Sequence, residues 1–157
     1  MALSDSLANY FGFEEHGTTL RTEVLAGLTT FLTMSYIVVV NPSILAGIPG
    51  EKPGIVVAGY GPGEVQSMLA VVTIVAAATA TLIMALYANR PFGLAPGLGL
   101  NAFFAFTVVL GLGIPWQTAL AAVFVEGVLF MLLTAVGARE YVIRLFPEPV
   151  KRSVGAG

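Results

Sequence analysis

The sequence predicts an all-α polytopic membrane protein with four transmembrane spans, of which the third is interrupted. Of the 157 residues, 57% are hydrophobic and only 10% are charged, and the mean hydropathy is +0.88. A soluble domain does not tolerate this composition on its surface. The apolar residues also fall in blocks of about 20, the length that crosses the hydrocarbon core of a bilayer. Composition and block length together therefore define the class.

The chain divides into three parts. Residues 1–22 are a lead-in that we expect on the cytoplasmic side, and the lack of Lys or Arg among its first twenty residues predicts no cleavable signal peptide. Residues 23–137 hold spans 1 to 4. Residues 138–157 are a cytoplasmic interfacial segment that is truncated before a fifth span. Four apolar residues of the lead-in are typical of a short amphipathic turn at the interface: Leu7, Tyr10, Phe11 and Phe13.

The first two spans are separated by a polar loop. The first span covers about residues 24–40 and should end or kink at Asn41 and Pro42, because proline lacks a backbone donor and disfavours helix in the residue before it. Residues 47–63 are rich in proline and glycine, which indicates an aqueous loop. The second span covers about residues 67–88 and contains no charge.

The third span is apolar but crowded with helix breakers. Residues 91–101 contain two prolines and three glycines, so we expect an extended or unwound segment there. A half-helix should follow over residues 102–112, beginning near Asn101. Such irregular backbone is tolerated at membrane depth only where protein or a cavity satisfies its polar groups. The fourth span follows at about residues 116–136.

Basic residues predict the orientation, since short cytoplasmic loops collect Lys and Arg. With four spans and a cytoplasmic N-terminus, only Lys52 lies outside. Six basic residues then face the cytoplasm: Arg21, Arg90, Arg139, Arg144, Lys151 and Arg152.

Several function classes are disfavoured. The net charge of −2 lacks the basic footprint of a nucleic-acid-binding protein. The chain has no cysteine, and His16 is its only histidine, so we expect no metal site. The glycines around Leu98 lack the spacing of a dinucleotide loop. No nucleophile, base and orienting group occur together, so we expect neither an enzyme nor a cofactor.

The interrupted third span is the candidate ligand site. A half-helix that begins at membrane depth directs free N–H groups into the protein, as the broken helices of secondary transporters do. Its irregular backbone includes Pro96, Gly97 and Gly99; the alternative is a structural proline kink. Asn101 should cap the half-helix, either as a cap alone or also as a ligand for substrate amides.

Three polar side chains in other spans complete the candidates. Glu126 lies near the middle of the fourth span, where an ionisable group is costly and indicates either proton handling or a structural hydrogen bond to the broken span. Thr33 and Tyr36 in the first span lie close to the Asn-Pro break and are candidate substrate ligands, although hydroxyls often bond their own helix instead.

Three stretches of the sequence resemble one known family. Residues 17–42 (GTTLRTEVLAGLTTFLTMSYIVVVNP), 88–106 (ANRPFGLAPGLGLNAFFAF) and 118–127 (TALAAVFVEG) are similar to the first, third and fourth spans of nucleobase-cation symporters of the xanthine/uracil permease superfamily. The similarity is to the adenine, guanine and hypoxanthine permease branch, and it covers nearly the whole chain from about Leu7.

The resemblance implies a fold of fourteen spans in two inverted repeats of seven. This chain would be an N-terminal fragment of it, and its four spans would be the first part of the core domain. The third span would then be a short strand followed by a helix. A purine would bind at Asn101 and at the backbone near Ala102, Phe103 and Phe104. The complete protein would be a proton-coupled purine permease of the plasma membrane and a homodimer without metal or organic cofactor. Its acidic coupling residues would lie in later spans.

Two other functions stay open. A transporter of the same fold could carry uracil, xanthine or inorganic anions. A small membrane subunit that assembles with a partner without binding substrate would instead leave Asn101 and Glu126 dispensable.

Overall fold

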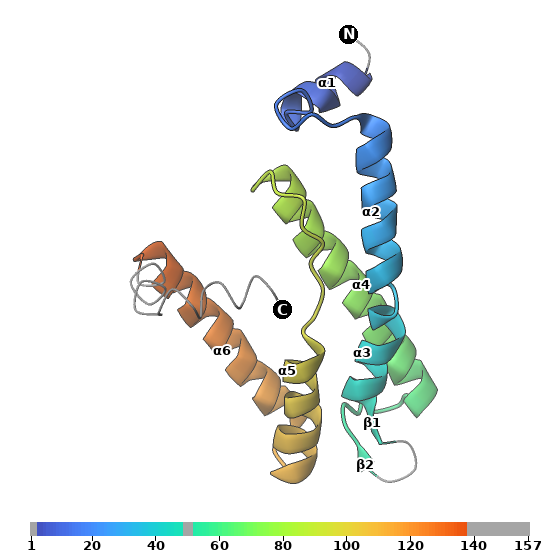
Figure 1. Ribbon diagram of the computed structural model, residues 1–157. Helices are drawn as coiled ribbons and strands as arrows, with labels where there is room; N and C mark the ends of the chain where they lie inside the picture. The colour runs from blue at the N-terminus through green and yellow to red at the C-terminus, as the bar shows by residue number, and fades with distance from the viewer. Residues whose placement is uncertain (1–2, 49–51, 138–157) are drawn as a thin grey trace, which may run out of the picture. The chain divides into compact units, whose positions relative to one another are not determined.

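The computed structural model describes residues 3–48 and 52–137, most of which are helical (Figure 1). They form two compact units, within residues 1–113 and 114–157. In the described residues, three helical stretches are long and apolar enough to cross a membrane: Leu20–Ala46, Pro62–Leu86 and Trp116–Ala135. A shorter apolar stretch covers Leu98–Gly111. The predicted all-α class is confirmed.

The lead-in contains helix α1 (Leu3–Tyr10) and is tied to the end of the second span. The Tyr10 hydroxyl donates a hydrogen bond to the Leu86 carbonyl. The Asn89 side chain donates to the Tyr10 carbonyl at 3.4 Å. The N-terminal lead-in and the C-terminal end of the second span therefore lie at the same end of the first unit.

The first span consists of α2 (Leu20–Met34) and α3 (Ile37–Ala46). The expected end at Asn41 and Pro42 is wrong, because α3 continues through both. The break lies one to two turns earlier, at residues 35–36, where Val38 bonds back by only three residues. A proline ring disturbs the carbonyl four residues before it, so the irregularity appears on the N-terminal side of the proline.

The loop after α3 contains a short antiparallel pair, β1 (Gly47–Ile48) and β2 (Lys52–Pro53), with Gly47 opposite Pro53. Beyond it, the Gly54 N–H donates to the Ala46 carbonyl at 2.8 Å. A side chain at position 54 would collide with the backbone of α3. Glycine is therefore required where the loop closes on the helix end.

The second span is α4 (Pro62–Leu86) and begins five residues before the expected start. Pro62 suits the first turn, where its missing N–H costs nothing. The Glu64 carboxylate accepts the Gly61 N–H at 2.8 Å and completes the helix start. Helix α4 packs along α3.

The third span is extended and then helical, as expected. Residues 89–97 have no regular structure, and no β partner pairs with them within the described residues. The expected short strand is therefore replaced here by an extended segment that is held by a side chain. Helix α5 (Leu98–Ala102) continues into the π-helix η1 (Phe103–Gly111). The helix begins at Leu98 with Gly97 as its N-cap, so the expected start near Asn101 is wrong.

The second unit contains α6 (Trp116–Ala135), which matches the fourth predicted span to within one residue. Pro115 precedes its first residue and fixes the backbone for the helix start. Along α6 only Ala119 is buried within the unit. The remaining apolar face is open to lipid or to other spans.

Candidate functional site

The extended segment of the third span is held by a single side chain of α4. The Leu94 N–H donates to the Thr81 hydroxyl oxygen at 2.9 Å, and the same hydroxyl donates to the Leu94 carbonyl at 3.2 Å. Thr81 thereby makes both hydrogen bonds that a neighbouring strand would otherwise supply at this residue. A threonine at this point on α4 lets irregular backbone lie against an apolar helix.

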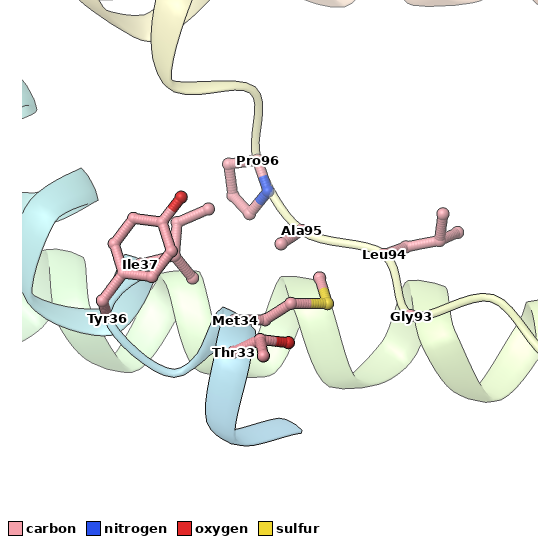
Figure 2. Close-up of a pocket in the computed structure, with 8 residues that line it drawn as sticks. All are labelled: Thr33, Met34, Tyr36, Ile37, Gly93, Leu94, Ala95 and Pro96. Atoms are coloured by element: carbon pink, nitrogen blue, oxygen red, sulfur yellow. The ribbon is translucent and has the colours of Figure 1, made fainter. Parts of the chain in front are cut away.

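A pocket of about 340 Å³ lies where the extended segment passes the break in the first span (Figure 2). Its volume is at the lower end of the range for small-molecule sites. Neither wall of the pocket is a regular helix: one wall is the junction of α2 and α3, and the other is residues 93–96. The lining residues are Thr33, Met34, Tyr36, Ile37, Gly93, Leu94, Ala95 and Pro96.

The pocket offers a few polar groups in an apolar frame. Figure 2 shows the Tyr36 hydroxyl directed toward the side of the pocket where Pro96 lies. The Thr33 hydroxyl donates to the Thr30 carbonyl at 2.8 Å, which leaves its oxygen lone pair as an acceptor. The N–H and C=O groups of Leu94 are both bonded to Thr81.

Glycine at position 93 lets the two walls approach closely. A Cβ atom built there would lie 2.9 Å from the Met34 sulfur and 3.2 Å from the Thr30 methyl carbon. The distance between α2 and the extended segment, and so the width of the pocket, depends on this absence of a side chain.

Outside the pocket lining, a line of polar side chains connects three helices. The Asn101 side chain on α5 donates from Nδ2 to Oδ1 of Asn41 on α3. Asn41 donates from Nδ2 to the hydroxyl oxygen of Thr73 on α4 at 2.9 Å, and Thr73 donates to the Leu69 carbonyl at 2.7 Å. Asn41 is 2% exposed and Thr73 is 3% exposed. We call these three side chains, Asn101, Asn41 and Thr73, the amide relay.

The structure divides the expected site residues of the first and third spans into two groups. Thr33, Tyr36 and Pro96 meet at the pocket. The others lie on the half-helix or at its start, outside the pocket lining: Gly97, Gly99, Asn101, Ala102, Phe103 and Phe104. Phe104 is buried and Phe103 is exposed.

Asn101 is not the helix cap that its sequence position suggested. Its own N–H donates to the Gly97 carbonyl at 3.1 Å, so it lies one turn inside the helix, and its side chain bonds Asn41 instead of orphan N–H groups. Glu126 lies on an exposed face of α6 in the second unit. Its two expected roles therefore stay predictions.

Sequence reasoning missed Asn41 and Thr73 as site residues. Asn41 was considered only as part of a helix break, and Thr73 not at all. The available signal was an amide among the valines of the first span, because a polar side chain in an apolar span requires a partner.

Long apolar helices, an interrupted span and a pocket between two irregular segments define a membrane transport protein of the permease class. The xanthine/uracil permease profile, described as the Permease family, matches residues 21–157. The chain belongs to this permease family. The relatives described next are permeases.

Three relatives show the extent of the similarity. A putative permease of Methanocaldococcus jannaschii is 47% identical over 94% of this chain. The adenine permease AdeP of Escherichia coli is 44% identical over 96%, and the guanine/hypoxanthine permease PbuG of Bacillus subtilis is 44% identical over 96%. The matched region is 31% of the first two relatives and 33% of the third. The chain thus spans about a third of the length of these relatives.

Proposed function

We propose that the chain supplies one half of the substrate site of a proton-coupled permease for purine nucleobases such as adenine, guanine or hypoxanthine. The observation that carries the proposal is the pocket between the α2–α3 junction and residues 93–96. It is largely apolar, with hydroxyl and backbone groups at its edges. A flat, polar-edged base requires both features.

The relatives support the choice of purines. AdeP is an adenine permease and PbuG a guanine/hypoxanthine permease, and each is similar to nearly all of this chain. In this proposal Tyr36 and Thr33 contact the base from the first span, and Asn101 contacts it from the half-helix. The remaining spans of the transporter close the site from the opposite side.

The proposed setting is the plasma membrane, with a cytoplasmic N-terminus. The hydrogen bonds of Tyr10 and Asn89 support this orientation. They place the lead-in and the residues around Arg90 at one end of the unit. In the complete transporter, further spans, lipid and a second copy of the protein would cover the apolar faces that are exposed here, such as that of α4.

Uptake of radiolabelled adenine, guanine and hypoxanthine into a purine-transport-deficient bacterium tests the proposal. The chain is expressed alone, with the open reading frame that follows it, and as a chimera that replaces the matching third of AdeP. Saturable uptake by the extended form or the chimera that is lost with Asn101→Ala supports the proposal. A higher KM with Tyr36→Phe places the base in the pocket. Normal membrane insertion of both forms without uptake contradicts it.

A second substrate class follows from the family, whose profile is named for xanthine and uracil permeases. Competition for uptake separates the classes, because uracil or xanthine would then compete at lower concentration than adenine or hypoxanthine. Sulfate serves as the anion control. A subunit without a substrate site predicts that Asn101→Ala and Glu126→Ala leave the partner's uptake unchanged.

A further inference from the structure

We infer that Thr73 is a positioning residue that determines, through Asn41, which atom of the Asn101 amide is presented to the substrate. The inference rests on the proposed function and deepens it. A primary amide has a donor end and an acceptor end of nearly equal size, and packing alone scarcely distinguishes them. Something must therefore fix the orientation of the Asn101 amide.

The direction of the amide relay begins at Thr73. Its single hydroxyl hydrogen is donated to the Leu69 carbonyl at 2.7 Å, so the hydroxyl oxygen can only accept from Asn41. Asn41 must therefore direct Nδ2 toward Thr73, where the distance is 2.9 Å. The Thr73 hydroxyl is the only member of the relay that is anchored to the backbone of its own helix.

The orientation of the Asn41 amide determines that of the Asn101 amide on the half-helix. With Nδ2 of Asn41 directed at Thr73, Oδ1 of Asn41 faces Asn101 and requires a donor. Asn101 must then turn its own Nδ2 toward Asn41, and its Oδ1 atom remains. Within the described residues, Asn41 is the only hydrogen-bond partner of the Asn101 side chain. The relay therefore leaves the acceptor oxygen of Asn101 for the substrate that the proposed function places beside it, and the substrate group that this oxygen recognises is an N–H donor.

The energetics favour a fixed direction. Asn41 and Thr73 are 2% and 3% exposed, so reversing the relay would require the Thr73 hydroxyl to turn away from the Leu69 carbonyl and lose that hydrogen bond, without water to compensate. A relay with one low-energy direction discriminates between ligand donors and acceptors, which a freely flipping amide does not.

The test is competition for radiolabelled adenine uptake by the transporter that contains this chain. Two kinds of analogue are compared: methylated adenines that each lack one N–H donor, and deaza-adenines that each lack one ring-nitrogen acceptor. The variants are Thr73→Val, which removes the hydroxyl at nearly constant volume, and Thr73→Ser, which keeps it. Thr79→Val, at an exposed position of the same helix, is the matched control.

In the parent, Thr73→Ser and Thr79→Val proteins, we expect at least one lost donor to weaken competition about three- to tenfold relative to adenine, the value of one neutral hydrogen bond. In Thr73→Val, the analogue and adenine should compete almost equally, so the ratio of their inhibitory concentrations should fall toward one. Asn41→Leu should have the same effect, and the double variant should add nothing, because both substitutions break one relay.

Two results would overturn the inference. In the first, the Thr73→Val protein keeps the parental ratio of analogue to adenine competition for every analogue, and its Vmax falls only in proportion to the amount of protein in the membrane. That result would indicate a structural role. The other is a parent that discriminates only among lost acceptors, which reverses the assigned polarity. Absence of adenine uptake by the parent would instead count against the proposed function. The two failures are therefore distinguishable.

Discussion

The hydroxyl of Thr81 is hydrogen-bonded to both backbone groups of Leu94, so one side chain of α4 takes the place of a neighbouring strand. Thr81→Val should leave both groups unpaired in an apolar setting, at about 1–3 kcal/mol for each. We expect a lower thermal unfolding temperature of the detergent-solubilised transporter and reduced initial uptake. Thr81→Ser retains the hydroxyl and should behave like the parent; equal loss in both variants would argue against the hydrogen bonds.

The width of the pocket should depend on Gly93. Gly93→Ala places a methyl group against Met34 and Thr30, and overpacking of this kind costs about 1–3 kcal/mol. We expect a raised KM for purine uptake, with partial recovery in the double variant with Met34→Ala, which removes the nearest atom. Gly27→Ala serves as the control. Gly27 lies on α2, the helix of Thr30 and Met34, and has open space around it. A KM unchanged by Gly93→Ala would show that the segment moves freely.

The interrupted third span could be predicted from sequence because its cause is local. Pro91, Pro96 and Gly97 each disfavour helix at their own positions, whatever surrounds them. The contact of Asn41 with Asn101 could not be predicted from sequence, because 60 residues separate them and only tertiary packing brings them together. The end of the first span was misplaced for a related reason. The packing of α3 on α4 keeps Pro42 inside a helix that local preference alone would end.

A pair of threonines on α2 tests which face of the first span contacts the substrate. Thr33 and Thr29 each donate a hydrogen bond to a carbonyl of their own helix, at 2.8 Å, but only Thr33 lines the pocket. Thr33→Val should raise KM about three- to tenfold through loss of one acceptor oxygen. Thr29→Val should leave KM unchanged. Similar KM values for the two variants in uptake assays would place the base elsewhere.

Membrane orientation is testable at two alanines, because the chain has no cysteine of its own. Ala58 lies in the loop before α4 and Ala88 follows that helix, and both are exposed. With a cytoplasmic N-terminus, a membrane-impermeant thiol reagent added to intact cells should label Ala58→Cys. Ala88→Cys should be labelled only after the cells are permeabilised. The reverse pattern would invert the proposed topology.

Glu126 is the one ionisable residue of α6, and its role can be separated into hydrogen bonding and proton transfer. We expect Glu126→Gln to keep most of the uptake, because an amide side chain still forms hydrogen bonds at this position. Glu126→Leu should lose it, because leucine forms none. The measurement is initial purine uptake against external pH for both variants and the parent.

The shape of that pH profile decides the role. Glutamine cannot gain or lose a proton near neutral pH, so a purely structural Glu126 leaves the pH dependence of Glu126→Gln superimposable on that of the parent after scaling. A profile that becomes flat would contradict this expectation and assign the carboxyl group to proton coupling. A membrane-protein immunoblot is required for each variant, since loss of the protein alone lowers uptake equally at every pH.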